Sequence, residues 1–382
     1  MTEKLQSTLS AVFEAQTRDF FNPSRLSIAR KRRGLTRLQL AKRLGVTPRA
    51  VTGYEAGEYP PVAEVQAKLP TVLGYPLEFY FGDDLDEPEV CAVSFRSLTR
   101  MTAKKRDMAL SQGALAILLA RWLDRKFVLP SCSLPDMSAE NNPEAAAQYL
   151  RDCWALGQTP VKNMVHLLES KGVRVFSLAV EAREVDAFST WLDDVPYVFL
   201  NSYKSAEHSR YDAAHELGHL VLHKHGAALG RQAESEANQF AAAFLMPRAG
   251  TIANAPKFPE IPELKARKTV WRTSITAYTH RLHELGLISK WQYQNLAVEM
   301  SKRGYRRHEP DSVPRETSLI LPKLFAMLYQ EDGMTRSRIA DELRIPVYEL
   351  EKLVFSLVMT GLPGGKPGEK LSRNPHLLTR VK

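Results

Sequence analysis

Two histidines, His215 and His219, flank a glutamate in the pattern His215-Glu216-Leu-Gly-His219. The surrounding segment, 211–222, contains several alanines and leucines and no proline, which favours a helix. Residues four apart in a helix lie one turn apart on the same face, so both imidazoles are able to bind one divalent ion. Glu216 projects to the side of the first histidine, where a carboxylate takes a proton from water beside the ion. This combination is the apparatus of a metallopeptidase.

A catalytic zinc site needs a third protein ligand and one open position, and two further histidines follow this pattern. His225 has the spacing used by metzincins, but that motif needs a glycine where this chain has Leu222. His223 lies on the same helix as the first two histidines, and three residues at successive turns of one helix do not converge on a point. Neither histidine is therefore the preferred third ligand.

The segment 234–247 predicts a second helix with an apolar stripe. At 100° per residue, Glu234 falls within about 50° of the centre of that stripe and Glu236 about 110° away. A carboxylate that points into a packed face needs a strong partner, such as a metal ion. We therefore expect Glu234 as the third ligand, with Glu236 as the alternative. Asp212 and Asn238 are candidates for orienting the ligands, because metal-bound histidines usually donate their other nitrogen to such groups.

The two segments together resemble the ImmA/IrrE family of metallopeptidases, compact relatives of the thermolysin-like enzymes. The resemblance covers about residues 160–250 and is carried by His215-Glu-Leu-Gly-His219, Glu234-x-x-Ala-Asn-x-Phe-Ala241 and Leu245-Met-Pro247. It implies His215, His219 and Glu234 as metal ligands and Glu216 as general base. It also implies zinc as the cofactor, with manganese as the alternative, and a transcriptional repressor as the protein substrate.

A basic segment lies near the N-terminus, where residues 25–49 hold nine basic side chains and no acidic one. Within it, Gly34-Leu-Thr36 ends one helix and caps the next, over 37–44, and Gly45-Val46-Thr47 leads into a third helix, over 48–55. This arrangement is a helix-turn-helix. It resembles the Cro/lambda-repressor-like, or XRE, family over about residues 24–82, through Leu35-Thr36, Leu40-Ala41, Leu44-Gly45-Val46-Thr47 and Tyr54-Glu55-x-Gly57.

Double-stranded DNA is the partner that this motif predicts. The second helix of the motif enters the major groove by its N-terminal residues, while neighbouring groups hold phosphates. We expect Arg49 and Thr52 at base edges, and Arg33, Arg37 and Thr47 at phosphates. The family usually has a glutamine where this chain has Arg37, so the phosphate contact there is expected to be electrostatic.

The chain as a whole predicts a mainly α fold with a small β-sheet (α+β), because segments 173–178, 186–192 and 195–200 have strand patterns and most others have helical ones. One of these strands is a candidate for pairing with the substrate backbone. The length of 382 residues indicates several domains. We expect a helix-turn-helix domain at 20–82, an acidic linker and helical bracing region at 83–159, a thermolysin-like metallopeptidase domain at 160–250, a C-terminal helical domain at 251–360 and a flexible tail at 361–382.

Composition limits the classes of protein to which the chain belongs. No apolar run approaches the roughly 18 residues that cross a bilayer, and the first residues do not form a signal peptide, so we expect no membrane partner and a cytoplasmic location. Three widely spaced cysteines argue against a disulfide framework. The net charge of +9 favours an acidic partner.

Residues 319–355 have helix-turn-helix proportions, but Glu349 and Glu351 on the last helix favour packing or a homodimer over DNA reading.

Two functions follow from these motifs. The first is a DNA-binding transcriptional regulator that carries a zinc endopeptidase and cleaves a repressor or another regulatory protein. The alternative is a transcriptional repressor whose metal site is a sensor or structural element without peptidase activity. Glu216 discriminates between them, because a structural zinc site is normally closed by four ligands and has no use for a free carboxylate beside the ion.

Overall fold

The structure, a computed structural model, describes residues 20–88, 102–178, 187–225, 230–305, 307–355, 357–358 and 379–380. By their contacts these residues form two compact units. One comprises the described parts of residues 1–88, 101–126 and 327–353, and the other the described parts of 127–326 and 354–382. The flexible tail expected at 361–382 lies outside the described residues, except for Thr379–Arg380.

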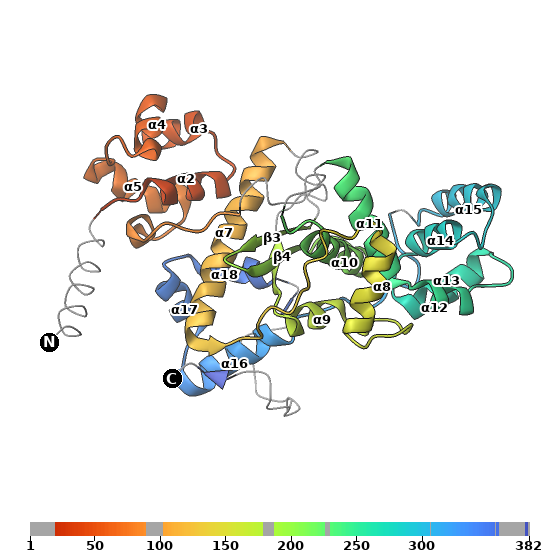
Figure 1. Cartoon of the computed structure of the whole chain (residues 1–382). Coiled ribbons are helices and arrows are strands. Elements are labelled where there is room, and N and C mark those ends of the chain that lie inside the picture. Colours follow the sequence, from red (N-terminus) through yellow and green to blue (C-terminus); the bar gives the residue numbers. More distant parts are fainter. Residues whose placement is uncertain are drawn as a thin grey trace. The chain divides into compact units, whose positions relative to one another are not determined.

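The first unit is all helical (Figure 1). Its elements are α2 (Pro23–Arg32), α3 (Arg37–Leu44), α4 (Pro48–Ala56), α5 (Ala63–Leu73), the 3-10 helix η2 (Leu77–Phe81), α7 (Ala103–Lys126), the last part of α16 (Ile320–Asp332), α17 (Arg336–Leu343) and nearly all of α18 (Val347–Val354). The core of its N-terminal part includes Leu26, Leu40, Val51 and Leu69, each fully buried.

Local capping explains where α3 and α4 begin and end. The Thr36 hydroxyl accepts from the Gln39 backbone N–H, and the Gln39 side chain accepts from the Thr36 backbone N–H, which satisfies two free donors at the start of α3. Gly45 ends this helix in the left-handed conformation, at φ 74°, and Thr47 then caps α4. The predicted starts of both helices and the predicted end of α3 are therefore confirmed, and α4 ends one residue later than predicted.

The region predicted to brace the peptidase contributes to both units. Its helix α7 packs against α2 and α17 in the first unit. Its helix α8 (Pro143–Cys153) packs against α11 in the second unit. The domain boundaries drawn from the sequence stay a prediction.

The second unit holds a three-stranded sheet and the remaining helices. Its further elements are β1 (Phe127–Val128), α9 (Met164–Ser170), β2 (Arg174–Leu178), β3 (Phe188–Leu192), β4 (Val195–Asn201), α10 (Ala206–Leu222), α11 (Arg231–Leu245), α12 (Arg248–Ala253), α13 (Ile261–Trp271), α14 (Ile275–Glu284), α15 (Lys290–Lys302), the first part of α16 and β5 (Thr379–Arg380). The predicted fold class, mainly α with a small sheet, is confirmed.

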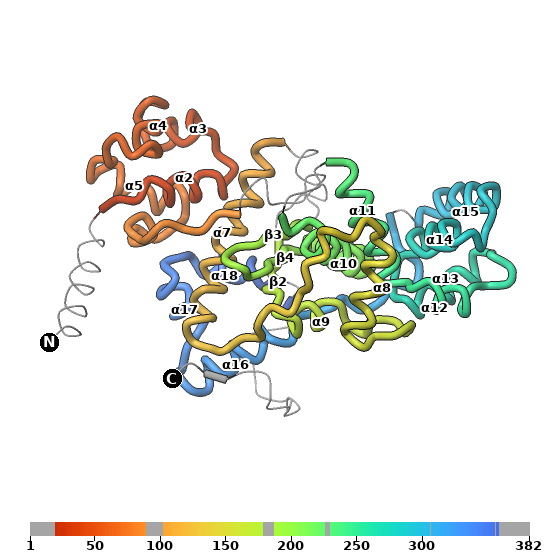
Figure 2. Tube along the Cα trace, in the orientation of Figure 1, coloured from red at the N-terminus to blue at the C-terminus, as the bar shows by residue number. Residues whose placement is uncertain are grey.

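The sheet has the strand order β2-β4-β3 and lies against α10 (Figure 2). β4 pairs in parallel with β2 and antiparallel with β3, with Phe199 opposite both Phe176 and Phe188. These aromatic side chains are buried and stack, which fixes the register of the sheet. β3 also contacts α10 directly: the Trp191 indole N–H donates to the Leu220 carbonyl over 3.1 Å.

The helices α10 and α11 pack closely together, and Gly218 makes this possible. A Cβ atom at Gly218 would lie 3.1 Å from Phe240 Cδ1 and 3.3 Å from Ala237 Cα, tighter than nearly all Cβ contacts in proteins. The absence of a side chain therefore lets the two helices approach each other at the point where their polar groups meet.

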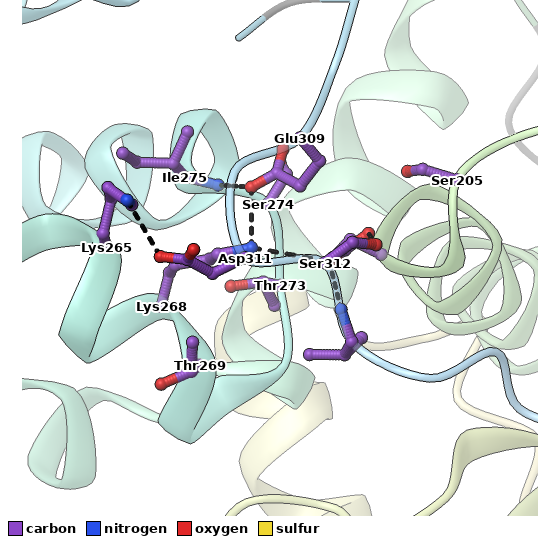
Figure 3. A network of polar contacts seen from close by, with 12 residues as sticks. Ser205, Lys265, Lys268, Thr269, Thr273, Ser274, Ile275, Glu309, Asp311 and Ser312 are labelled. Atoms are coloured by element: carbon purple, nitrogen blue, oxygen red, sulfur yellow. Dashed lines mark hydrogen bonds and ion pairs between the residues drawn. The ribbon is translucent and has the colours of Figure 1, made fainter.

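A buried ion network holds the first turn of α10 (Figure 3). Lys268 of α13 has no exposed surface and lies 3.4 Å from Glu207 Oε1 and 2.9 Å from Glu309 Oε1. The Val313 backbone N–H also donates to Glu207, over 2.8 Å. A buried lysine is tolerated only when it is paired with acidic groups. These contacts also hold the segment after α15 against the start of the helix that carries the histidines. Among the helices described, none is both long and apolar enough to cross a membrane.

Candidate functional site

The two histidines of α10 converge at one point. The helix begins after Ser205, whose hydroxyl accepts from the His208 backbone N–H, and it continues without a break past both residues. His215 Nε2 and His219 Nε2 lie 3.1 Å apart, and both side chains are about nine-tenths buried. The i, i+4 spacing therefore brings two potential donors together on one face, as expected from the sequence.

Glu234, in the first turn of α11, completes the cluster. Its Oε2 lies 3.5 Å from His215 Nε2, and its Oε1 lies 3.5 Å from His219 Nε2. Among the described residues, these three side chains form one group with the composition and spacing of a metal site. The alternative ligand, Glu236, turns away and lies 2.9 Å from His223 Nε2.

The two other histidines considered as ligands lie outside the cluster. His223 presents Nδ1 to His219 Nδ1 over 3.0 Å, on the side of that ring that faces away from Glu234. His225 is largely exposed and pairs with Asp136 over 2.6 Å. The structure thus brings Glu234 to the histidine pair and leaves His223, His225 and Glu236 in other contacts.

The donor set fits a divalent ion such as zinc. Ligands at about 2.0 to 2.1 Å from a tetrahedral ion are separated from one another by roughly 3.3 Å. The three donor separations in this cluster, 3.1, 3.5 and 3.5 Å, are close to that value. Two imidazoles and one carboxylate are also the ligand types of catalytic zinc sites with one open position.

The electrostatics of the cluster favour an ionised carboxylate. Burial alone would raise the pKa of Glu234, but hydrogen bonds to His215 and His219 and their charge hold it well below its usual range. Burial lowers the pKa of His219 to about 4, so that this imidazole is neutral at neutral pH. The pKa of His215 is raised: burial lowers it, but Glu234 and Glu216 more than compensate. An anionic carboxylate and a neutral imidazole are the forms that bind metal.

Glu216 lies beside the cluster without belonging to it. Its carboxyl group is buried, and its Oε2 accepts a hydrogen bond of 2.7 Å from the Ser189 hydroxyl on β3. Burial raises the pKa of Glu216 to about 7. A carboxyl group with such a pKa is able to accept and return a proton near neutral pH. The sequence carried no signal for Ser189, because its role depends on how β3 packs against α10.

A second set of contacts holds the His215 ring. Its Nδ1 lies 3.2 Å from Asn238 Oδ1, and the Asn238 amide donates to the Glu234 carbonyl over 2.7 Å. The donation to the carbonyl places the amide oxygen toward the histidine, which is the orientation that accepts from a metal-binding imidazole. Asp212, the other candidate for this task, pairs instead with Lys204 over 3.1 Å.

The predicted DNA-contacting residues all lie in the first unit. Arg49, Thr47 and Thr52 are exposed on or beside α4. The Thr47 hydroxyl accepts from the Ala50 backbone N–H, and the Thr52 hydroxyl donates to the Pro48 carbonyl. Arg49 and Thr52 are thus displayed near the N-terminus of the helix that the motif predicts to read DNA.

The two other predicted phosphate contacts differ in accessibility. Arg37 is half exposed and pairs with Glu55 over 2.7 Å. Arg33 is largely buried, with Nη1 2.6 Å from Glu349 Oε1 and Nε donating to the Leu73 carbonyl over 2.6 Å. This geometry favours Arg37 over Arg33 as a phosphate contact, and both assignments stay predictions.

Comparison with protein families identifies both parts of the chain. Residues 168–283 match the family model of the IrrE N-terminal-like domain, a peptidase family, and residues 26–80 match that of the helix-turn-helix. The first match extends from α9 into α14 and includes the whole histidine and glutamate cluster. A search of curated proteins gave no match. The chain thus joins a helix-turn-helix of the DNA-binding type to a metallopeptidase-like domain, as the sequence motifs indicated.

Proposed function

We propose that this chain is a DNA-binding transcriptional regulator that carries a zinc-dependent endopeptidase, and that the endopeptidase cleaves a repressor or another regulatory protein. The observation that carries the proposal is the convergence of His215, His219 and Glu234 beside a second acid that is not part of the cluster. That acid, Glu216, is buried and bonded only to a serine hydroxyl among the side-chain contacts described.

In this proposal His215 Nε2, His219 Nε2 and one oxygen of Glu234 hold the ion, and manganese is the alternative to zinc. When bound, the ion supplies a Lewis acid for a peptide carbonyl and for water. Glu216 accepts a proton from the attacking water and delivers it to the nitrogen of the leaving amine. Ser189 holds Oε2 of Glu216, which leaves the other carboxylate oxygen for the transfer.

The substrate is proposed to bind in an extended form along β3. This strand lies at the edge of the three-stranded order and against α10, and its Ser189 touches the proposed general base. A peptide that adds to this edge by backbone hydrogen bonds would present its scissile carbonyl near the histidines. Backbone hydrogen bonds do not depend on the side chains of the peptide, so this way of binding is compatible with a protein substrate.

A repressor is the proposed substrate class because of the domain to which the peptidase is joined. A helix-turn-helix in the same chain brings the peptidase to double-stranded DNA, where DNA-bound repressors are concentrated. The alternative function, a repressor with a structural or sensing metal site, leaves Glu216 without a role. A buried carboxylate with no task is costly, which favours the peptidase.

The experiment compares the zinc-loaded chain with its Glu216→Gln variant. Each is incubated with candidate repressors encoded nearby, and the products are resolved by mass spectrometry. We expect a specific fragment from the parent chain and none from the variant, while zinc content is equal. The exposed Asp194→Asn variant serves as a control that keeps cleavage. Cleavage by Glu216→Gln at the parental rate, or a parent chain without zinc, would refute the proposal.

A further inference from the structure

A chain of hydrogen bonds leads from His219 away from the proposed metal site. His219 Nδ1 lies 3.0 Å from His223 Nδ1, and His223 Nε2 lies 2.9 Å from Glu236 Oε2. The other carboxylate oxygen of Glu236 accepts from the Gln232 amide over 2.9 Å. The His219 and His223 side chains are about nine-tenths buried, and that of Glu236 is 26% exposed.

The backbone explains why these groups meet. His223 is the first residue after α10, yet its N–H still donates to the His219 carbonyl over 3.0 Å, so its imidazole lies one turn beyond that of His219. Glu234 and Glu236 both lie near the start of α11, two residues apart, and therefore point to different sides. One reaches the histidine pair and the other reaches His223.

The directions of the hydrogen bonds follow from the chemistry of imidazole. Two Nδ1 atoms share a hydrogen bond only if one of them carries the proton. If His223 carried it and were neutral, its bare Nε2 would face the Glu236 carboxylate, and two lone pairs would repel each other. In neutral His223 the carboxylate therefore favours the proton on Nε2, which leaves His223 Nδ1 as an acceptor. His219 must then donate from Nδ1, and its Nε2 is left bare.

We infer that His223 and Glu236 are positioning residues that keep His219 in the tautomer competent to bind the ion. The inference rests on the proposed metallopeptidase function and deepens it. Glu236 acts through His223, and His223 acts through His219, so neither touches the ion or the substrate. The two groups that the sequence offered as rival ligands thus have a different task.

The comparison with His215 shows what this arrangement adds. His215 Nδ1 lies 3.2 Å from a neutral amide oxygen, that of Asn238. His219 is instead supported by an anion, Glu236, which reaches it through the imidazole of His223. A carboxylate behind a histidine ligand increases the basicity of the ligand as well as fixing its ring, and loss of such a partner typically weakens metal binding about 10- to 100-fold.

The first test measures zinc affinity of the full-length chain by competition with a chromophoric chelator. We expect His223→Phe, which keeps the ring shape and removes the acceptor, to weaken zinc binding roughly 10- to 100-fold. Glu236→Gln should weaken it less, because an amide accepts or donates and so no longer selects one tautomer. The matched control is His225→Phe, which removes a histidine paired with a carboxylate outside the cluster and should bind zinc like the parent.

The second readout is the tautomer itself, from long-range proton–nitrogen NMR of zinc-loaded protein labelled with ¹⁵N-histidine. The parent should show a protonated Nε2 on His223 and a protonated Nδ1 on His219, and Glu236→Gln should give a mixture at His223. A parent with the opposite His223 tautomer overturns the inference. So does a parent that binds zinc and cleaves substrate while His223→Phe and Glu236→Gln bind zinc equally well, an outcome that leaves the proposed function intact. A parent without zinc affinity overturns both.

Discussion

Glu349 offers a sharp test of how the helix-turn-helix unit is stabilised. Its side chain has no exposed surface, and its two oxygens accept from Arg32 Nε over 2.9 Å and from Arg33 Nη1 over 2.6 Å. The Arg33 guanidinium also lies 4.8 Å from the Tyr75 ring centroid and 5.1 Å from that of Tyr348. The carboxylate on α18 is therefore the counterion of two arginines at the end of α2.

The perturbation is Glu349→Gln, which keeps the shape of the side chain and removes its charge. Loss of one partner from a buried ion pair typically costs about 3 to 5 kcal/mol, because the remaining charge stays desolvated. Arg33 is 20% exposed and regains some hydration, so we expect the lower end, about 3 kcal/mol. For a unit of this size each kcal/mol shifts the melting temperature by roughly 3 °C, so the expected shift is about 10 °C.

The assay is differential scanning calorimetry of the full chain, with Glu351→Gln as the matched control. Glu351 lies on the same helix and pairs with Arg336 over 2.8 Å, but its side chain is 50% exposed. Exposed ion pairs contribute at most about 1 kcal/mol, so the control should shift the transition by less than about 3 °C. Equal shifts in the two variants would show that burial of the Glu349 contact does not control its energy.

Three other predictions concern the two sites. In the metal-free chain the pKa of Glu216 is raised to about 7. The protonated Glu216 carboxyl group therefore stabilises the fold fully below the ordinary pKa of glutamate, and this stabilisation is lost as pH rises through 7. The free energy of unfolding of Glu216→Gln, relative to that of the parent chain, should therefore increase by up to about 3 kcal/mol from pH 5 to pH 8. Chemical denaturation with a chelator present measures this difference. Arg49→Ala should weaken DNA binding by roughly 5- to 150-fold in a fluorescence anisotropy titration at fixed salt. Gly218→Val, whose Cβ would meet Phe240 and Ala237, should cost about 1 to 3 kcal/mol in thermal unfolding and lower zinc affinity by moving α11.

Much of the local structure was predictable because short-range physics decides it. Thr36 and Thr47 cap their helices, and Gly45 ends α3, as residues of these types do in most proteins. The i, i+4 spacing of the histidines needs only a helix to place both on one face. Even the placement of Glu234 beside the histidines followed from its angle to an apolar stripe, because the stripe determines which side of α11 packs against α10.

The unpredicted contacts depend on the packing of elements that are distant in the chain. Ser189 touches Glu216 because β3 is the edge strand nearest α10, and nothing in the Phe188-Ser-Thr segment indicates that order. Glu349 favoured a packing role for its helix, but the sequence did not indicate its partner, an arginine at the end of α2 some 316 positions away in the chain. Charged residues normally signal a solvated face, so a buried ion pair is what a sequence pattern is least able to show.

Each proposed site is built from residues of one unit, and this bears on how the two proposed activities are linked. The proposed zinc ligands and Glu216 all come from the second unit, and the predicted DNA contacts all come from the first. Among the described residues, neither proposed site takes a side chain from the other unit, so the proposal assigns no structural change at the histidines to DNA binding. Covalent linkage alone still raises the concentration of the peptidase near proteins bound to the same DNA, typically to the millimolar range for short connections. The proposed regulator therefore acts selectively on DNA-bound substrates through linkage alone.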